Sequence, residues 1–224
     1  HESIYGICKY LEENGFIIDY VNNTKDGLID FDDLKSLVTK DTILVSICAV
    51  NSELGIRQPL KIIKQIIKKE NPDCVFHSDM TQAIGKVNIN VNDVDLATIS
   101  GHKIYGPTGI GVLYGKEEWL DRMPPYQGGG EMIESVSFEK TTFEKLPFKF
   151  EAGTPDYVAT HGLAKAIDYV SALGMDNIAQ HEKELTRYCM EQMRTVDGIR
   201  LFGEQEGKDA VVSFLVGDIH HMDM

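Results

Sequence analysis

Hydrophobic and polar residues form two kinds of pattern along the first half of the chain, one with a helical period and one of continuous apolar runs. Apolar residues recur at helical spacing in three segments, which predict helices at residues 3–14, 31–38 and 60–69. Continuous apolar runs such as Thr42–Val50 are typical of strands that are buried on both faces. Strands are predicted at residues 16–21, 42–50, 74–79, 96–100 and 112–114. Because strands alternate with helices, the pattern favours βαβ units and a three-layer α/β/α fold with a mostly parallel sheet.

The helix predicted at residues 60–69 is amphipathic, with isoleucines on its inner face and lysines on its outer face. The side chains expected to point inward are Ile62, Ile63, Ile66 and Ile67. Asp30 is expected to cap the helix that begins at Phe31, and Gly15 is expected to end the first helix.

Residues 122–156 differ from the rest of the chain, since they are rich in Gly and Pro. A connection of this length is expected to be either functional or mobile. Beyond it two helices and then two strands are predicted, at residues 157–172, 175–195, 199–202 and 210–216. We therefore predict a large domain at residues 1–156 and the start of a smaller α+β domain at residues 157–224.

Composition and charge narrow the class of protein. The chain has 22 basic and 35 acidic residues, and its net charge of -13 argues against nucleic-acid binding because it repels phosphate backbones. No apolar run reaches the ~18 residues of a membrane helix, and no signal peptide or membrane association is predicted. The four cysteines form no CxxC pair, so neither a zinc site nor a disulfide framework is expected. A reduced, cytoplasmic compartment fits best.

Polar side chains follow three of the predicted strands, at Val50–Ser52, at Asp79 and at Ser100–Lys103. Ligands of open α/β sheets bind beyond the carboxyl ends of the strands, so these are candidate site residues. A lysine at such a strand end, crowded by glycines, can be held in a partly desolvated cleft. Its pKa would fall there, and its free amine could attack an aldehyde. The alternative for Lys103 is a solvated surface group, as most lysines are.

Asp79 also has two interpretations. It caps a helix that begins at Thr81, or its carboxylate faces a cationic atom of a ligand, such as the pyridine nitrogen of pyridoxal 5'-phosphate (PLP). A helix that began here would place Gln82 on the same face as Asp79. Ser100 and His102 could donate hydrogen bonds to a phosphate, and the alternative is a turn-stabilising serine beside a surface histidine.

Two runs, HSDMTQ at residues 77–82 and SGHKIYGPTG at residues 100–109, resemble the class V aminotransferase group and most closely its cysteine desulfurases. The resemblance covers nearly the whole chain. It implies a fold-type I PLP enzyme that works as a homodimer. Such enzymes take sulfur from L-cysteine, leave L-alanine, and hold the sulfur as a cysteine persulfide for iron–sulfur cluster assembly, where a sulfur-acceptor protein receives it.

Carried over by position, the resemblance gives a role to each candidate. Lys103 would form the Schiff base with PLP, and Asp79 would pair with the pyridine nitrogen. Gln82 would reach the phenolic oxygen of the ring, while Ser100 and His102 would bind the phosphate.

Three further positions carry cofactor contacts in the resembling family. His1 falls at the histidine that stacks on the ring. Thr154 matches the threonine that reaches the phosphate of the neighbouring subunit's cofactor. Ser52 stands where the family usually has the second of two asparagines, which contacts the phenolic oxygen, and its side chain is shorter.

The resemblance is uneven along the chain. Up to about Lys103 the sequence resembles the NifS/IscS branch, and from Pro124 through Thr154 it resembles the SufS branch. We expect the family's phosphate-binding loop, which would precede His1, to be missing. The persulfide-forming cysteine and the substrate-binding arginine, which would follow Met224, are also expected to be missing. None of the four cysteines in the chain matches the position of the nucleophile. The chain is therefore predicted to be a fragment of a cysteine desulfurase, inactive in sulfur transfer. Another class V aminotransferase or lyase, or a non-catalytic truncated product, are the alternatives.

Overall fold

The computed structural model describes residues 1–205 and 207–224 and shows an α/β fold built on a mixed four-stranded sheet. The strands of this sheet, in spatial order, are β1 (Leu44–Ser46), β2 (Val75–Asp79), β3 (Leu96–Ser100) and β4 (Gly111–Gly115). The pairs β1–β2 and β2–β3 are parallel, whereas β3–β4 is antiparallel. The parallel part of the prediction is confirmed, and β4 adds an antiparallel edge.

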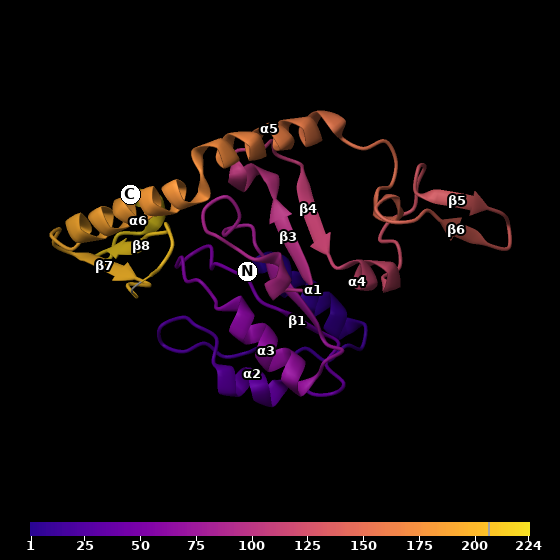
Figure 1. Ribbon diagram of the computed structural model, residues 1–224. Helices are drawn as coiled ribbons and strands as arrows, with labels where there is room; N and C mark the ends of the chain where they lie inside the picture. The colour runs from indigo at the N-terminus through magenta and orange to yellow at the C-terminus, as the bar shows by residue number, and fades with distance from the viewer. Residues whose placement is uncertain (206) are drawn as a thin grey trace.

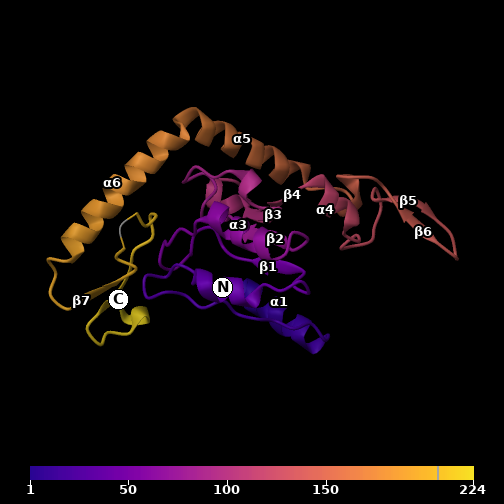
Figure 2. The same ribbon diagram turned by 60° about the horizontal axis from the view of Figure 1, so that its bottom comes forward.

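Helices and two small hairpins surround this sheet (Figures 1 and 2). The α-helices are α1 (Glu2–Glu13), α2 (Phe31–Leu37), α3 (Leu60–Glu70), α4 (Glu117–Arg122), α5 (Tyr157–Leu173) and α6 (Met175–Met193). The 3-10 helices are η1 (Val91–Asp93), η2 (Gly101–Ile104), η3 (Phe148–Phe150) and η4 (His221–Asp223). The hairpins pair β5 (Ile133–Val136) with β6 (Thr141–Phe143), and β7 (Ile199–Phe202) with β8 (Ser213–Val216).

The hydrophobic core joins the sheet to α2 and α3. Phe76 of β2, Leu34 of α2, and Ile63 and Ile67 of α3 are fully buried in one cluster. Asp30 caps α2 as predicted, since its carboxylate accepts hydrogen bonds from the next turn of backbone. Burial of these side chains fixes β2 and β3 as the central strands and so fixes the edge at which they end.

One strand prediction is wrong and a second is wrong in part. Residues 16–21 form no strand, although this segment connects α1 to the rest of the fold. The apolar run 42–50 contributes only the short β1, which lies at the edge of the sheet, and Leu44 is 49% exposed. An apolar run indicates burial only where neighbours exist on both sides, and β1 pairs on one side alone among the described residues.

The inner face of α3 is narrower than predicted. Ile63 and Ile67 are fully buried, but Ile62 is 46% exposed. Residues 62 and 63 differ by about 100° around a helix axis, so a face centred on Ile63 and Ile67 turns Ile62 outward.

The second half of the chain wraps around one side of the sheet. Figure 1 shows α5 passing over the end of β3, with the β5–β6 hairpin and the β7–β8 hairpin at opposite ends of the molecule. The segment 122–156, predicted to be functional or mobile, holds the β5–β6 hairpin and η3. None of the described helices is both long and apolar enough to cross a membrane. The division into domains at residue 156 stays a prediction.

Candidate functional site

The carboxyl ends of β2 and β3 place Asp79 and Ser100–Lys103 at one edge of the sheet. Asp79 is the last residue of β2, Ser100 is the last residue of β3, and η2 carries His102 and Lys103. The two strands are adjacent and parallel, so they end on the same side. A hydrogen bond of 3.2 Å from the Ser100 backbone N–H to Thr81 Oγ1 joins the two loops directly. The structure thus brings together the residues on which the sequence analysis depended most.

Asp79 is half-buried and only partly hydrogen-bonded. Its Oδ1 accepts a hydrogen bond of 2.9 Å from the Thr81 backbone N–H. In the described part of the chain Oδ2 has no hydrogen-bonding partner. Asp79 therefore caps a turn rather than the helix that one interpretation predicted at Thr81, and it still offers an oxygen to a cationic group.

Gln82 does not lie on a helix with Asp79, so that prediction is wrong. Residues 81–86 form successive turns. The Gln82 Oε1 accepts a hydrogen bond of 3.0 Å from Lys86 Nζ, which turns the amide toward its own loop. Gly85 has a φ of +74°, a value that helices do not contain, and it explains why the turns do not continue into a helix.

Lys103 and His102 are exposed, which corrects the expectation of a partly desolvated lysine in this chain. The loop that carries them is nevertheless tightly held. Gly106 N–H donates a hydrogen bond of 3.0 Å to the Gly101 carbonyl, and both glycines pack against Leu163 of α5. The structure therefore fixes the backbone of η2 while leaving the lysine amine accessible.

A Gly106→Ala substitution is expected to destabilise the chain by about 1–3 kcal/mol through overpacking. A Cβ at this position would lie 2.8 Å from the Gly101 carbonyl oxygen and 2.8 Å from Leu163 Cδ1. Gly128→Ala is the matched control, because no atom lies within 4 Å of its added Cβ. Denaturant unfolding of both variants measures the difference, and equal stability of the two would contradict this account of the loop.

A chain of polar side chains crosses the sheet next to Asp79 and was missed by the sequence analysis. His77 of β2 contacts Ser46 Oγ of β1 through Nδ1 at 2.8 Å and Thr98 Oγ1 of β3 through Nε2 at 3.1 Å. His77 is two residues before Asp79, so both side chains lie on the same face of the sheet. Burial lowers the pKa of His77, and the Asp79 carboxylate opposes that shift. The imidazole thus joins three strands at the candidate site.

The lowered pKa of His77 predicts a loss of stability in mild acid. The unfolded chain binds a proton at higher pH than the folded chain, so stability is full above the ordinary imidazole pKa of 6.5 and falls as the pH drops below it. His77→Gln keeps groups that can bond to both hydroxyls but cannot titrate. Thermal unfolding at about pH 7.5 and about pH 5.5 should show a smaller pH dependence for the variant. An unchanged pH dependence would contradict the assignment to His77.

No hydrogen bond joins the other three predicted residues to this cluster in the described structure. His1 is exposed and caps α1, since its Nδ1 accepts a hydrogen bond of 3.3 Å from the Ser3 backbone N–H. Ser52 is half-buried in the loop after β1, and Thr154 is exposed just before α5. Burial raises the pKa of the Cys48 thiol, the Asp79 carboxylate raises it further, and the positive amino terminus lowers it.

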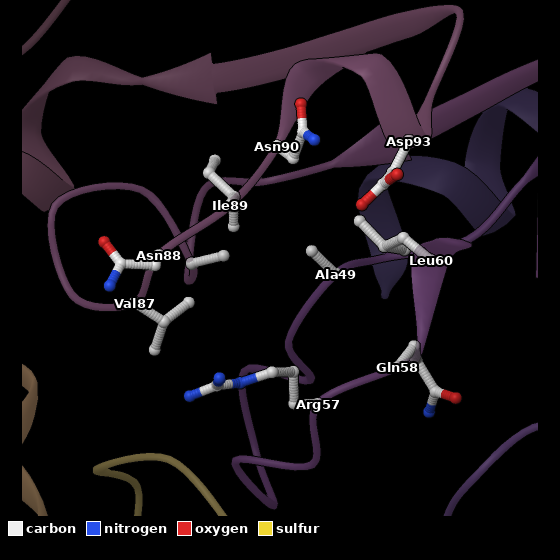
Figure 3. A pocket seen from close by; sticks show the side chains of 10 residues that line it. Ala49, Arg57, Gln58, Leu60, Val87, Asn88, Ile89, Asn90 and Asp93 are labelled. Atoms are coloured by element: carbon white, nitrogen blue, oxygen red, sulfur yellow. The ribbon is translucent and has the colours of Figure 1, made fainter. Parts of the chain in front are cut away.

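The cavity drawn in Figure 3 does not coincide with this cluster. It has a volume of about 110 Å³ and is formed by the loops at residues 49–60 and 83–93. None of the residues predicted to bind a ligand lines it. The candidate site therefore lies outside this cavity.

The full length of the chain, residues 1–224, matches the family model described as aminotransferase class-V. The chain belongs to the class V aminotransferase family. A "probable cysteine desulfurase" of Staphylococcus epidermidis is 41% identical over 227 residues, and a cysteine desulfurase of Haloferax volcanii is 34% identical over 225 residues. These alignments cover 100% of this class V chain and 54% and 53% of the two relatives, so the chain spans about half the length of the curated relatives it matches.

Solved cysteine desulfurases have the same fold as this class V chain. The apo cysteine desulfurase from Thermococcus onnurineus superposes with a TM-score of 0.92 at 30% identity, covering 100% of this chain and 56% of the other. The cysteine desulfurase CsdA of Escherichia coli gives a TM-score of 0.83 at 30% identity, with coverage of 91% and 50%. The likeness to cysteine desulfurases stated from the two sequence runs is thereby confirmed.

Proposed function

We propose that this chain is the cofactor-binding part of a PLP-dependent cysteine desulfurase. The observation that carries the proposal is the shared edge of β2 and β3, where Asp79 and the Ser100–Lys103 segment meet in a class V chain. The curated relatives are named cysteine desulfurases, which supports L-cysteine as the substrate. We expect the full-length protein to convert it to L-alanine with release of sulfur.

The side chains at this edge fit PLP chemically. A phosphate needs hydrogen-bond donors, and Ser100 and His102 offer a hydroxyl and an imidazole on one short segment. A protonated pyridine nitrogen needs a carboxylate, and Asp79 keeps one oxygen free of protein partners in the described structure. An aldehyde needs an accessible amine, and Lys103 is exposed. These groups come from the ends of two adjacent strands, so one small ligand could contact all of them.

When bound, PLP supplies an electron sink for negative charge at the α carbon of the substrate. Lys103 would hold the cofactor covalently and, once released by the substrate, move protons as general base and acid. Asp79 would keep the pyridine nitrogen protonated. Gln82 would reach the phenolic oxygen once its amide leaves Lys86, with the shorter Ser52 at the second position that faces this oxygen. His1 would stack on the ring.

The thiol that receives the sulfur would come from elsewhere in the full-length protein. Burial raises the pKa of Cys48 and of Cys74, and a protonated thiol is a poor nucleophile. Cys8 lies on α1 and Cys189 on α6, whereas Asp79 and Lys103 lie at and beyond the ends of β2 and β3. The sulfur would then pass to an acceptor protein for iron–sulfur cluster assembly in the cytoplasm.

A homodimer would complete the site. The β5–β6 hairpin extends away from the main sheet in both ribbon views, and a two-stranded hairpin is marginally stable alone (Figures 1 and 2). Phe138 and Val136 on this hairpin are exposed, which favours a protein partner. Thr154 follows the hairpin and would reach the phosphate of the neighbouring subunit's cofactor. A second subunit would also cover the exposed Lys103.

The products formed from L-cysteine test the proposal in the full-length protein loaded with PLP. A desulfurase gives equimolar alanine and sulfide when a reducing thiol is present. An aminotransferase would instead give the keto acid of cysteine, and a non-catalytic protein would give neither. Either of those two results would reject the proposed function.

A further inference from the structure

The loop at residues 51–57 carries Ser52 and follows β1 toward the candidate site. It is a tight loop, because Asn51 N–H donates to the Ile56 carbonyl at 3.0 Å and Gly55 N–H donates to the Asn51 carbonyl at 2.9 Å. Asn51 Oδ1 also accepts hydrogen bonds from the backbone N–H groups of Glu53 and Leu54. These hydrogen bonds close the loop on itself, so we expect a displacement of its far end to displace Ser52 as well.

Asp209 and Ser213, just before and at the start of β8, contact this loop directly. Asp209 N–H donates a hydrogen bond of 2.8 Å to the Gly55 carbonyl, and the Ser213 hydroxyl donates to the Glu53 carbonyl. The approach is close enough to require glycine, since a Cβ on Gly55 would lie 2.6 Å from the Asp209 carbonyl oxygen. Gly55 also has a φ of +71°, which favours glycine independently.

An ion pair holds the two segments together. Arg57 Nε donates a hydrogen bond of 3.0 Å to Asp209 Oδ2, and a second guanidinium nitrogen contacts Asp209 Oδ1. The Asp209 side chain is only 8% exposed, whereas that of Arg57 is 47% exposed. A carboxylate this buried depends on its partner, so loss of either member leaves an unfavourable charge or a missing contact.

We propose that Arg57 and Asp209 are positioning residues that hold the 51–57 loop, and through it Ser52, in place for cofactor binding. This inference rests on the proposed function, because it assigns a PLP contact to Ser52. The two members of the pair are separated by 152 residues in the chain. The pair thus makes the geometry of the site depend on the β7–β8 unit, which contributes none of the residues proposed to contact the cofactor.

The two substitutions change the charge of the chain in opposite directions, which distinguishes a positioning role from a direct electrostatic effect on PLP binding. PLP carries a phosphate, so Arg57→Gln would weaken PLP binding on electrostatic grounds alone, whereas Asp209→Asn would strengthen it. Under the positioning role both variants weaken binding, because both release the loop. The double variant should be no weaker than the worse single variant, because the pair acts as one unit.

Equilibrium PLP titration of the full-length protein, followed by absorbance, measures this difference. Each single variant is expected to raise the Kd for PLP about fivefold, the order of effect seen when a residue acts through another. Arg194→Gln is the matched control, since it removes the same charge from the exposed pair Arg194–Glu204. It should leave the Kd within experimental error. Arg57→Lys, which keeps the charge but not the two-point contact, should fall between wild type and Arg57→Gln.

Hydrogen exchange without PLP gives a second readout. The backbone amides of Glu53, Leu54 and Gly55 should exchange faster in both single variants than in wild type. Their exchange rates should be unchanged in Arg194→Gln. In a Ser52→Ala background, Asp209→Asn should lose most of its effect on the Kd, because the pair acts through Ser52. Circular dichroism melts identify any variant that fails to fold. If Asp209→Asn does not fold, the Kd values of the Arg57 variants are compared instead.

Three results would overturn the positioning role. One is an unchanged Kd in both single variants, and another is opposite changes in Arg57→Gln and Asp209→Asn. The third is an undiminished effect of Asp209→Asn in the Ser52→Ala background. The wild-type full-length protein is titrated first, and its failure to bind PLP would reject the proposed function itself, together with the role that depends on it.

Discussion

Replacing Lys103 with alanine is expected to abolish the covalent capture of PLP. The amine at this position lies at the end of β3, on a loop whose backbone is fixed by the packing of Gly101 and Gly106 against α5. No other lysine has both this location and Asp79 on the adjacent strand end among the described residues. The measurement is the visible absorption band of lysine-bound PLP after removal of excess cofactor. The band should be present in wild type and absent in the variant.

The matched control for this loss is Lys61→Ala. Lys61 is exposed on α3, which packs against the hydrophobic core rather than the site loops. The Lys61→Ala substitution removes the same positive charge as Lys103→Ala and should leave the absorption band unchanged. A Lys103→Ala chain that is folded and still shows the full band would contradict the assignment of this lysine.

The second large effect concerns stability. Asp95→Asn is expected to lower the free energy of unfolding by about 3–5 kcal/mol, the usual cost of breaking a buried charge network. The Asp95 side chain is fully buried beside three ammonium groups, of which those of Lys68 and Lys116 lie 2.8 Å from its oxygens and that of Lys64 lies 3.4 Å away. Its Oδ2 also accepts a hydrogen bond of 3.0 Å from the Phe76 backbone N–H. The substitution therefore leaves three positive charges without their shared partner.

The pKa of Asp95 supports this expectation. Burial alone would raise that pKa, but hydrogen bonds from Lys116 and Lys68 outweigh burial and hold it well below its ordinary range. Denaturant unfolding measures the loss, with Asp168→Asn as the control. Asp168 pairs with Lys165 on the surface and is 68% exposed, so its loss should cost at most about 1 kcal/mol. Equal stability of the two variants would contradict the role given to Asp95.

The strands that end at the candidate site could be predicted from the sequence, because their positions follow from the local pattern of apolar residues. The run from 96 to 100 is apolar and ends at Ser100, and β3 has these bounds. Asp79 closes β2 for the same reason. Parallel neighbours end at one edge of a sheet, so the meeting of Asp79 with the Lys103 loop followed from the strand ends alone.

Contacts that depend on strand register could not be predicted in this way. The pairing of His77 with Ser46 and Thr98 requires knowledge of which residues lie opposite one another across three strands. The pair Arg57–Asp209 joins positions whose local sequences contain no sign of contact. The exposure of Lys103 was missed because the strand end alone does not indicate what covers the loop.

Covalent labelling of the wild-type chain tests the central claim most directly. PLP is added to the purified, folded chain, the adduct is reduced with borohydride, and the labelled peptide is identified by mass spectrometry. Our account predicts a single modified residue, Lys103. A label on any other lysine, or no label on a folded chain, would contradict it.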